Sequence, residues 1–83
     1  MKILYFAWLR ERLNKGEEEV SPPPEVETVD DLMTWLAAND EATALAFERR
    51  RIIRAAVDAE IATPETAIAS AKVVAFFPPM TGG

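Results

Sequence analysis

The amino-acid sequence predicts an α+β domain in which one layer of helix packs on one face of a sheet. The chain has 83 residues, of which 49% are hydrophobic, and this suits a single domain with a single core. Residues 2–9 and 72–77 are rich in aromatic and branched side chains, as strands are. Between them, residues 28–39 repeat apolar side chains at helical spacing. A sheet and a helix in one pair of layers define the α+β class.

The first part of the chain is predicted to form two strands. Residues 2–9 (KILYFAWL) make the first strand, and residues 10–15 add a helical turn. A lysine–glycine pair typical of a turn follows. Residues 17–21 (EEEVS) then form a polar edge strand. The three prolines at 22–24 end it, because proline has no N–H to donate to a sheet ladder.

The clearest helix begins after Thr28, which is predicted to be its N-cap residue. Asp31 follows three residues later, as in a capping box, and its negative charge suits the first turn of a helix. The buried face of this helix is expected to consist of Val29, Leu32, Met33 and Leu36. Asp40 is predicted to cap a second, short helix. The inner face of that helix is expected to consist of Ala42, Leu45 and Ala46.

The last part of the chain is predicted to hold two more strands. Residues 52–58 (IIRAAVD) form one of them, and Thr63 with Pro64 begins a single helical turn. Residues 72–77 (KVVAFF) form the last strand, which the two prolines at 78–79 must end. The chain is therefore divided into one domain, residues 1–77, and an extended C-terminal tail, residues 78–83.

The first and last strands are apolar on both faces. Side chains alternate between the faces of a strand, so Val73, Ala75 and Phe77 point one way and Val74 and Phe76 the other. The predicted helices suffice to cover one face only. We interpret the second face as a partner surface, since large exposed apolar patches mark interaction sites; alternatively, loops and prolines shield it. The candidate partner-interface residues are Phe6, Trp8, Phe76 and Phe77.

Composition excludes several classes of function. Nine Lys and Arg residues stand against fourteen Asp and Glu, and the net charge of −5 disfavours nucleic acid and anionic membranes as partners. The chain has no cysteine and no histidine, so disulfides, zinc ligands and an imidazole base are absent, and no metal site is expected. No leader or membrane-spanning run is recognised, and a cytoplasmic protein is expected. The basic run of residues 49–51 has two interpretations: contact with acidic groups of a partner, and the preference of a helix C-terminus for cations, which is a sufficient explanation.

The C-terminal tail is the most specific feature of the sequence. From Val73 onwards the chain has no ionisable side chain, so the α-carboxylate of Gly83 is the titratable group there. Pro78 and Pro79 favour an extended, stiff exit from the sheet. Gly82 and Gly83 have no Cβ, so the backbone can pass where a side chain would clash. This pattern predicts a carboxylate carried on a thin arm into a narrow pocket of another protein. The plainer alternative is an ordinary chain end.

The stretch VVAFFPPMTGG resembles the C-terminus of the small, sulfur-carrier subunits of molybdopterin synthases, which are ubiquitin-like proteins. KILYFAWLRE, TVDDLMTWLA and AAVD are similar to other segments of that family, so the resemblance covers essentially the whole chain. It implies a β-grasp fold, a mixed sheet with adjacent first and last strands curved around a helix. The sequence departs from the family at three places: Ser70-Ala71-Lys72 replaces Gly-Asp, Asp58 replaces Asn, and Trp8 replaces a polar residue.

The resemblance also implies a chemistry. A ubiquitin-activating-like adenylyltransferase uses ATP to adenylate the carboxylate of Gly83, and sulfur then replaces an oxygen to give a thiocarboxylate. The tail enters the large subunit of molybdopterin synthase and donates the sulfur to a pterin precursor. Gly82 provides clearance, and the other inserted residues are Pro78, Pro79, Met80 and Thr81. The resemblance further implies a heterotetramer of two small and two large subunits and no cofactor bound by this chain.

Two other functions are consistent with the same residues. The tail can serve a thiocarboxylate carrier of another sulfur pathway, such as thiamine or cysteine synthesis, or a protein-conjugating modifier. A different class is a non-catalytic module whose apolar strands simply dock a partner. Dependence of function on Gly83 distinguishes the carriers from the docking module.

Overall fold

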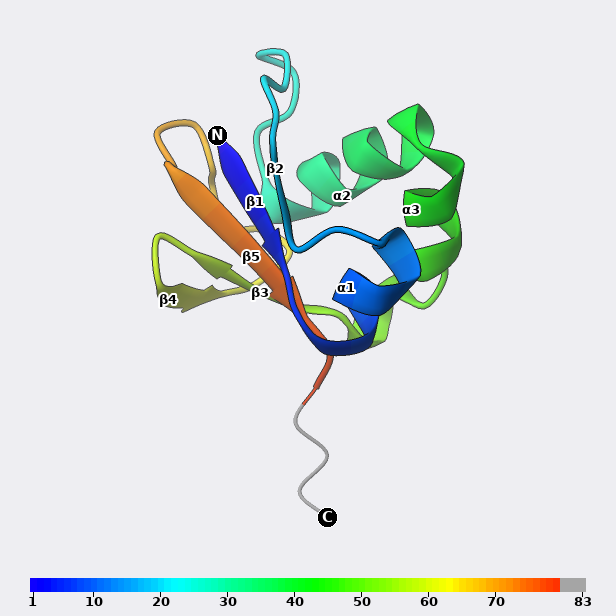
Figure 1. The fold of residues 1–83 in the computed structure, drawn as a ribbon. Helices are drawn as coiled ribbons and strands as arrows, with labels where there is room; N and C mark the ends of the chain where they lie inside the picture. The colour runs from blue at the N-terminus through cyan, green and yellow to red at the C-terminus, as the bar shows by residue number, and fades with distance from the viewer. Residues whose placement is uncertain (80–83) are drawn as a thin grey trace.

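The computed structural model describes residues 1–79, which form a mixed five-stranded sheet with helices on one of its faces (Figure 1). The helical elements are α1 (Ala7–Leu13), α2 (Val29–Asn39), α3 (Glu41–Ala46) and a 3-10 turn, η1 (Arg50–Ile52). The strands are β1 (Lys2–Tyr5), β2 (Glu17–Glu19), β3 (Arg54–Val57), β4 (Glu60–Ala62) and β5 (Val73–Phe77).

The strand order is β2-β1-β5-β3-β4. The first and last strands lie side by side and are parallel, with Ile3 opposite Val74 and Tyr5 opposite Phe76. The other three pairings are antiparallel. The predicted α+β class, and the mixed sheet with adjacent first and last strands, are confirmed.

Helices α2 and α3 begin where the sequence predicts. The Thr28 hydroxyl accepts a hydrogen bond from the Asp31 N–H, and the Asp31 carboxylate accepts one from the Thr28 N–H, which completes the capping box. Asp40 caps α3 through the Thr43 N–H. The predicted inner face of α3 is wrong at two positions: Ala42 and Leu45 are exposed, whereas Ala46 is buried together with Thr43. The short helix starts at Glu41, and this start turns Thr43 into the interior in place of Ala42.

The first strand is shorter than the sequence predicts. β1 ends at Tyr5, and residues 7–13 form α1, so the predicted strand over 2–9 is wrong in its second half. Ala7 turns the chain with a φ of 53°, and the apolar residues Leu9 and Leu13 then lie one helical turn apart on the core. An apolar run of this length fits either a strand or a buried helix segment, and contact with the core selects the helix here.

The sequence does not predict β4, the outer edge strand. Its partner β3 spans Arg54–Val57, and Asp58 and Ala59 make the tight turn between them, with φ values of 47° and 71°. Two consecutive residues with positive φ are typical of a two-residue hairpin, but the usual glycine signal is missing. The helical turn predicted at Thr63 and Pro64 is instead a non-helical turn.

Replacing Ala59 by Gly is expected to stabilise the protein. Alanine at a φ of 71° is strained by its Cβ, at a cost of roughly 1–2 kcal/mol, and glycine removes that strain at some cost in unfolded-state entropy. We expect a net gain of about 0.5–1 kcal/mol in the free energy of unfolding, measured by urea denaturation. In the control A44G, an exposed helical site, glycine is expected to destabilise by a similar amount. A loss of stability in A59G would contradict the turn geometry.

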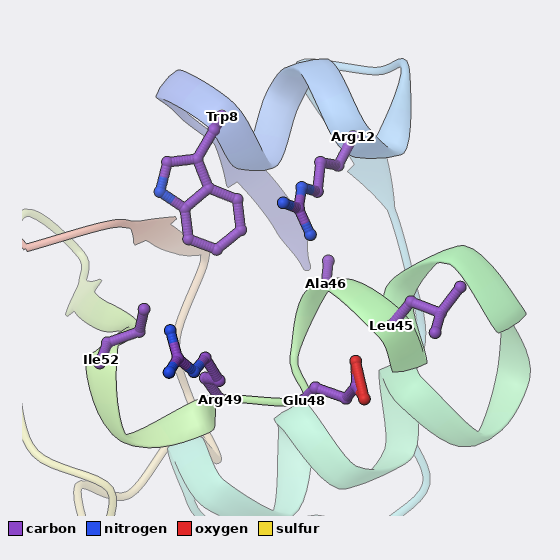
Figure 2. A pocket seen from close by; sticks show the side chains of 7 residues that line it. All are labelled: Trp8, Arg12, Leu45, Ala46, Glu48, Arg49 and Ile52. Atoms are coloured by element: carbon purple, nitrogen blue, oxygen red, sulfur yellow. The ribbon is translucent and has the colours of Figure 1, made fainter.

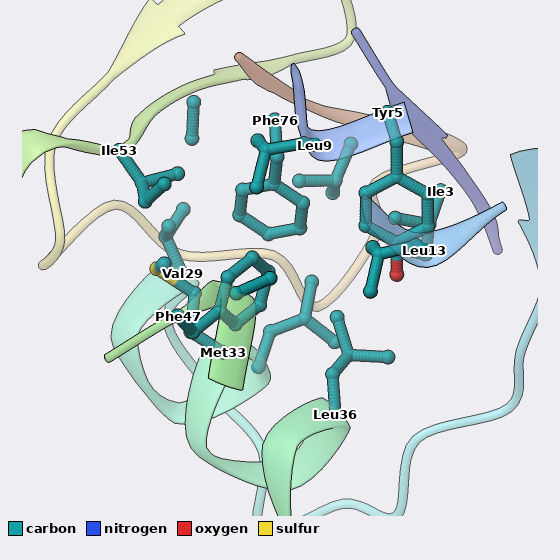
Figure 3. Close-up of a cluster of buried hydrophobic side chains, with 14 of the residues drawn as sticks. Ile3, Tyr5, Leu9, Leu13, Val29, Met33, Leu36, Phe47, Ile53 and Phe76 are labelled. Carbon is teal, nitrogen blue, oxygen red and sulfur yellow. The ribbon is translucent and has the colours of Figure 1, made fainter. Parts of the chain in front are cut away.

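The core lies between the sheet and the three helices (Figure 3). Phe76 and Val74 of β5 are fully buried. The Phe76 ring meets the edge of the Phe47 ring at a centroid distance of 5.4 Å and lies near that of Tyr5. Burial raises the pKa of the Tyr5 phenol, and its hydrogen bond to the Glu18 carboxylate acts in the same direction. β5 is therefore anchored in the hydrophobic core.

The β3–β4 turn also anchors the start of β5. The Asp58 carboxylate accepts hydrogen bonds of 2.9 Å from the backbone N–H groups of Val73 and Lys72, which lower its pKa. These contacts take place at the segment where the chain has Ser70-Ala71-Lys72. Asp58 thus joins the hairpin to the last strand.

Candidate functional site

The last strand determines where the tail leaves the domain. β5 lies between β1 and β3, so both of its edges are paired along its length. The final hydrogen bond on the β1 side runs from the Phe6 N–H to the Phe76 carbonyl at 3.1 Å. Phe77 is the last strand residue, as predicted, and Pro78 and Pro79 follow it without an N–H to extend the ladder. The tail therefore starts from a rigid, central point at one end of the sheet (Figure 1).

Met80, Thr81, Gly82 and Gly83 lie outside the described residues. The roles assigned to them from the sequence stay predictions. Pro78 and Pro79 are described, and both are half-buried at the base of the tail.

One of the four candidate interface residues belongs to the core. Phe76 has no exposed surface and packs among Tyr5 and Phe47, so its assignment to a free surface is wrong. The sequence predicts the alternation of β5 correctly but does not tell which of its faces meets the helices. Phe77 points to the other face and is half-buried. Phe6, beside it at the end of β1, is 47% exposed.

Trp8 does not share a sheet face with Phe6. It lies on the first turn of α1 and is half-buried, because the strand ends before it. Its indole faces the guanidinium of Arg12, whose central carbon is 5.1 Å from the ring centroid (Figure 2). The predicted grouping of Trp8 with Phe6 is therefore wrong, and Trp8 borders a separate hollow between helical elements.

The sheet face opposite the helices carries a row of apolar side chains, here called the open-face stripe. Cross-strand pairing brings its members into line: Leu4, Ala75, Ala56 and Ile61. The first three are half-buried, and Ile61 is 78% exposed. The helices all lie on the opposite side of the sheet (Figure 1). The predicted second apolar face is confirmed, and Ile61 is a member that the sequence analysis missed because it missed β4.

Residues 1–79 show no arrangement of side chains suited to catalysis on a small molecule. Among residues 1–79, no group of three or more Asp and Glu side chains is arranged to hold a metal ion. The three groups with a shifted pKa, Tyr5, Asp40 and Asp58, each serve a core contact, a helix cap or a turn. No helix in that part of the chain has the length and apolar character to cross a membrane. The arrangement offers an apolar open face and, at one end of it, the point where the chain leaves β5.

Known proteins resemble this chain over its whole length. The molybdopterin synthase sulfur carrier subunit of Escherichia coli (strain K12) is 35% identical over 83 residues, which cover 100% of this chain and 99% of that protein. The subunit of the same name from Haemophilus influenzae is 29% identical over the same lengths. The crystal structure of SAMP1 from Haloferax volcanii superposes with a TM-score of 0.74 at 25% identity, covering 99% and 97% of the two chains. The model of the ThiS family matches residues 3–83. The chain has the predicted β-grasp fold and belongs to the ThiS family.

Proposed function

We propose that this protein is the sulfur carrier of molybdenum cofactor biosynthesis and that Gly83 is the residue that carries the sulfur. The observation that carries the proposal is the Gly82-Gly83 end, which begins six residues beyond the buried Phe76. The chain that carries it matches two named carriers over its full length. The central position of β5 supports it, because a rigid base fixes where a short tail can reach.

The chemistry proceeds on the terminal carboxylate. One carboxylate oxygen of Gly83 attacks the α-phosphate of ATP, and pyrophosphate leaves. Hydrosulfide (HS⁻), supplied by a sulfur donor, then attacks the acyl carbon. AMP leaves with that oxygen, and loss of a proton gives the thiocarboxylate. At neutral pH the sulfur of a thiocarboxylate is a stronger nucleophile than the oxygen of a carboxylate. This chain contributes no cysteine or histidine to these steps, so the catalytic groups belong to the partners.

Two partners follow from this scheme. A ubiquitin-activating-like adenylyltransferase binds ATP and forms the adenylate, so this chain binds no cofactor of its own. The large subunit of molybdopterin synthase then takes the tail and passes the sulfur to a pterin precursor. We propose that two small and two large subunits form a heterotetramer.

The open face is the surface that we assign to the large subunit. Phe6 and Phe77 lie at the end of the sheet from which the tail leaves, and the open-face stripe extends from there across the strands. A partner that covers this surface buries apolar area and receives the tail at the same time. The prolines at 78–79 limit the directions in which the tail can leave, which reduces the entropy lost when it enters a pocket.

Intact-mass spectrometry tests the carrier chemistry. After incubation with ATP, a sulfur donor and the activating enzyme, we expect a mass gain equal to one exchange of oxygen for sulfur, which fragmentation assigns to Gly83. The same mixture without ATP is the control. An unchanged mass, with an activating enzyme that modifies a known carrier, would contradict the proposal. A thiocarboxylate that the large subunit does not use would assign the chain to another sulfur pathway.

A further inference from the structure

The arginines of this acidic protein gather at one end of the molecule. All six lie in two sequence segments, residues 10–12 and 49–54, although the net charge of the chain is −5. Folding brings these segments to the end of the sheet where β5 finishes. Arg54 pairs with Phe77 across the strands, and α1 starts directly after Phe6, whose N–H binds the Phe76 carbonyl. The positive charge therefore surrounds the base of the tail.

Some of these arginines have partners within the domain. Arg50 donates to the Asp30 carboxylate at 2.9 Å and to the Thr34 hydroxyl at 2.8 Å, which links η1 to α2. Arg54 donates to the Arg51 carbonyl at 2.9 Å. In contrast, neither Arg12 nor Arg49 forms an ion pair within residues 1–79. Preference for a helix C-terminus fits Arg12, which lies in the last turn of α1. It does not account for Arg49, because α3 ends at Ala46, before the basic run begins.

Arg12 and Arg49 line the same hollow, here called the α1–η1 groove. Its volume is about 310 Å³, and it is lined by Trp8, Arg12, Leu45, Ala46, Glu48, Arg49 and Ile52. Figure 2 shows the Trp8 indole and both guanidinium groups directed into the space between α1, α3 and η1. Leu45 is 60% exposed and Ile52 is 37% exposed. Cationic groups thus stand beside apolar surface that no other part of residues 1–79 covers.

This combination suits a carboxylate-bearing peptide. A guanidinium is weakly hydrated, and its planar donors match a carboxylate in geometry. The side chains of Trp8 and Ile52 offer apolar contact to a neighbouring side chain of the peptide. Tryptophan and arginine are also enriched among the residues that contribute most of the binding energy of protein interfaces. Glu48 lines the groove as well, so the site carries charges of both signs. The Glu48 carboxylate would repel a polyanion such as nucleic acid, whereas a peptide can place its carboxylate at the arginines only.

We propose that the α1–η1 groove binds an acidic segment of the large synthase subunit, one that sets a carboxylate between Arg12 and Arg49 and an apolar side chain against Trp8. This inference rests on the proposed function. The large subunit is the occupant because the groove adjoins the base of the tail: Trp8 lies two residues beyond Phe6, which binds Phe76. A protein that takes in the tail comes to lie over this end of the domain. The groove therefore extends the contact beyond the open face.

Charge reversal tests the proposal. Titration calorimetry with the purified large subunit is expected to show about tenfold weaker binding for R12E and for R49E, with a reduced dependence on salt. The matched control is K72E, which makes the same change in net charge at an exposed side chain outside the groove. It is expected to bind within about twofold of the unmodified protein. Thermal denaturation of all three variants establishes that they remain folded.

Photo-crosslinking identifies the segment. A photoreactive side chain in place of Ile52 is expected to label a peptide of the large subunit that contains Asp or Glu. Binding by R12E and R49E no weaker than by K72E, or labelling of a peptide without a carboxylate, would overturn the proposal. So would normal binding to the large subunit combined with lost adenylation, since the groove would then serve the activating enzyme.

These results are separable from a failure of the proposed function. If the carrier chemistry is wrong, the unmodified protein gains no sulfur at Gly83. If only the groove assignment is wrong, the unmodified protein acquires sulfur at Gly83, and both arginine variants bind the large subunit as tightly as the unmodified protein does.

Discussion

Deletion of Gly83 is expected to abolish sulfur transfer while the fold and the affinity for the large subunit persist. The chain then ends at Gly82, and its carboxylate is drawn back by about 3.3–3.6 Å, the length of one extended residue. Misplacement of a reacting atom by about 1 Å can cost a hundredfold in rate, so we expect a loss of at least about a thousandfold. A reconstituted synthase assay with the purified large subunit and activating enzyme measures this loss.

The fold is expected to persist because the core and the ladders of the described residues end before Pro78. The buried residues of the described chain end at Phe76, and the hydrogen bonds of β5 end with the strand at Phe77. We therefore expect the free energy of unfolding to change by less than about 0.5 kcal/mol. The variant G83A is a matched control, since it keeps the chain length and the terminal carboxylate and adds a methyl group. Full activity of the shortened protein would contradict the carrier role.

Replacement of Phe76 by alanine is expected to remove about half of the stability of the domain. The ring is fully buried between Tyr5 and Phe47, and its loss leaves a cavity in the centre of the core. Such changes cost about 3–5 kcal/mol. A domain of this size has a total stability of roughly 5–10 kcal/mol, so urea denaturation should show a large shift of the midpoint.

Phe77 is the matched control for this result, because it is the same residue type at the next position of the same strand. It is half-buried on the open face, and F77A is expected to cost about 1–2 kcal/mol. F77D is expected to stay folded and to bind the large subunit at least about tenfold more weakly, because a charge would be buried in the contact. Equal destabilisation by F76A and F77A would contradict the assignment of the two faces of β5.

Local chemistry explains what could be predicted from the sequence. Thr28 and Asp31 satisfy backbone N–H groups within one turn, so the start of α2 is visible in a few consecutive residues. Pro78 and Pro79 end β5 because they lack a donor, whatever the surroundings are. The stretch VVAFFPPMTGG likewise points to the family, because it depends on the order of residues and not on their packing.

The sequence by itself thus determined the α+β class, the caps of α2 and α3, the end of the last strand and the carrier-like tail. The tertiary structure alone decided which apolar residues are core and which are surface. An apolar run satisfies the alternation of a strand and the spacing of a short helix at once, and contact of Leu9 and Leu13 with the core selects the helix over residues 7–13. Phe76 and Phe77 point to opposite faces of the sheet. Phe76 is core and Phe77 is surface because the helices cover the face on which Phe76 lies. Arg12 and Arg49 line one groove only because α1 and η1 fold to the same end of the sheet, and no local pattern encodes the proximity of segments so far apart in the chain.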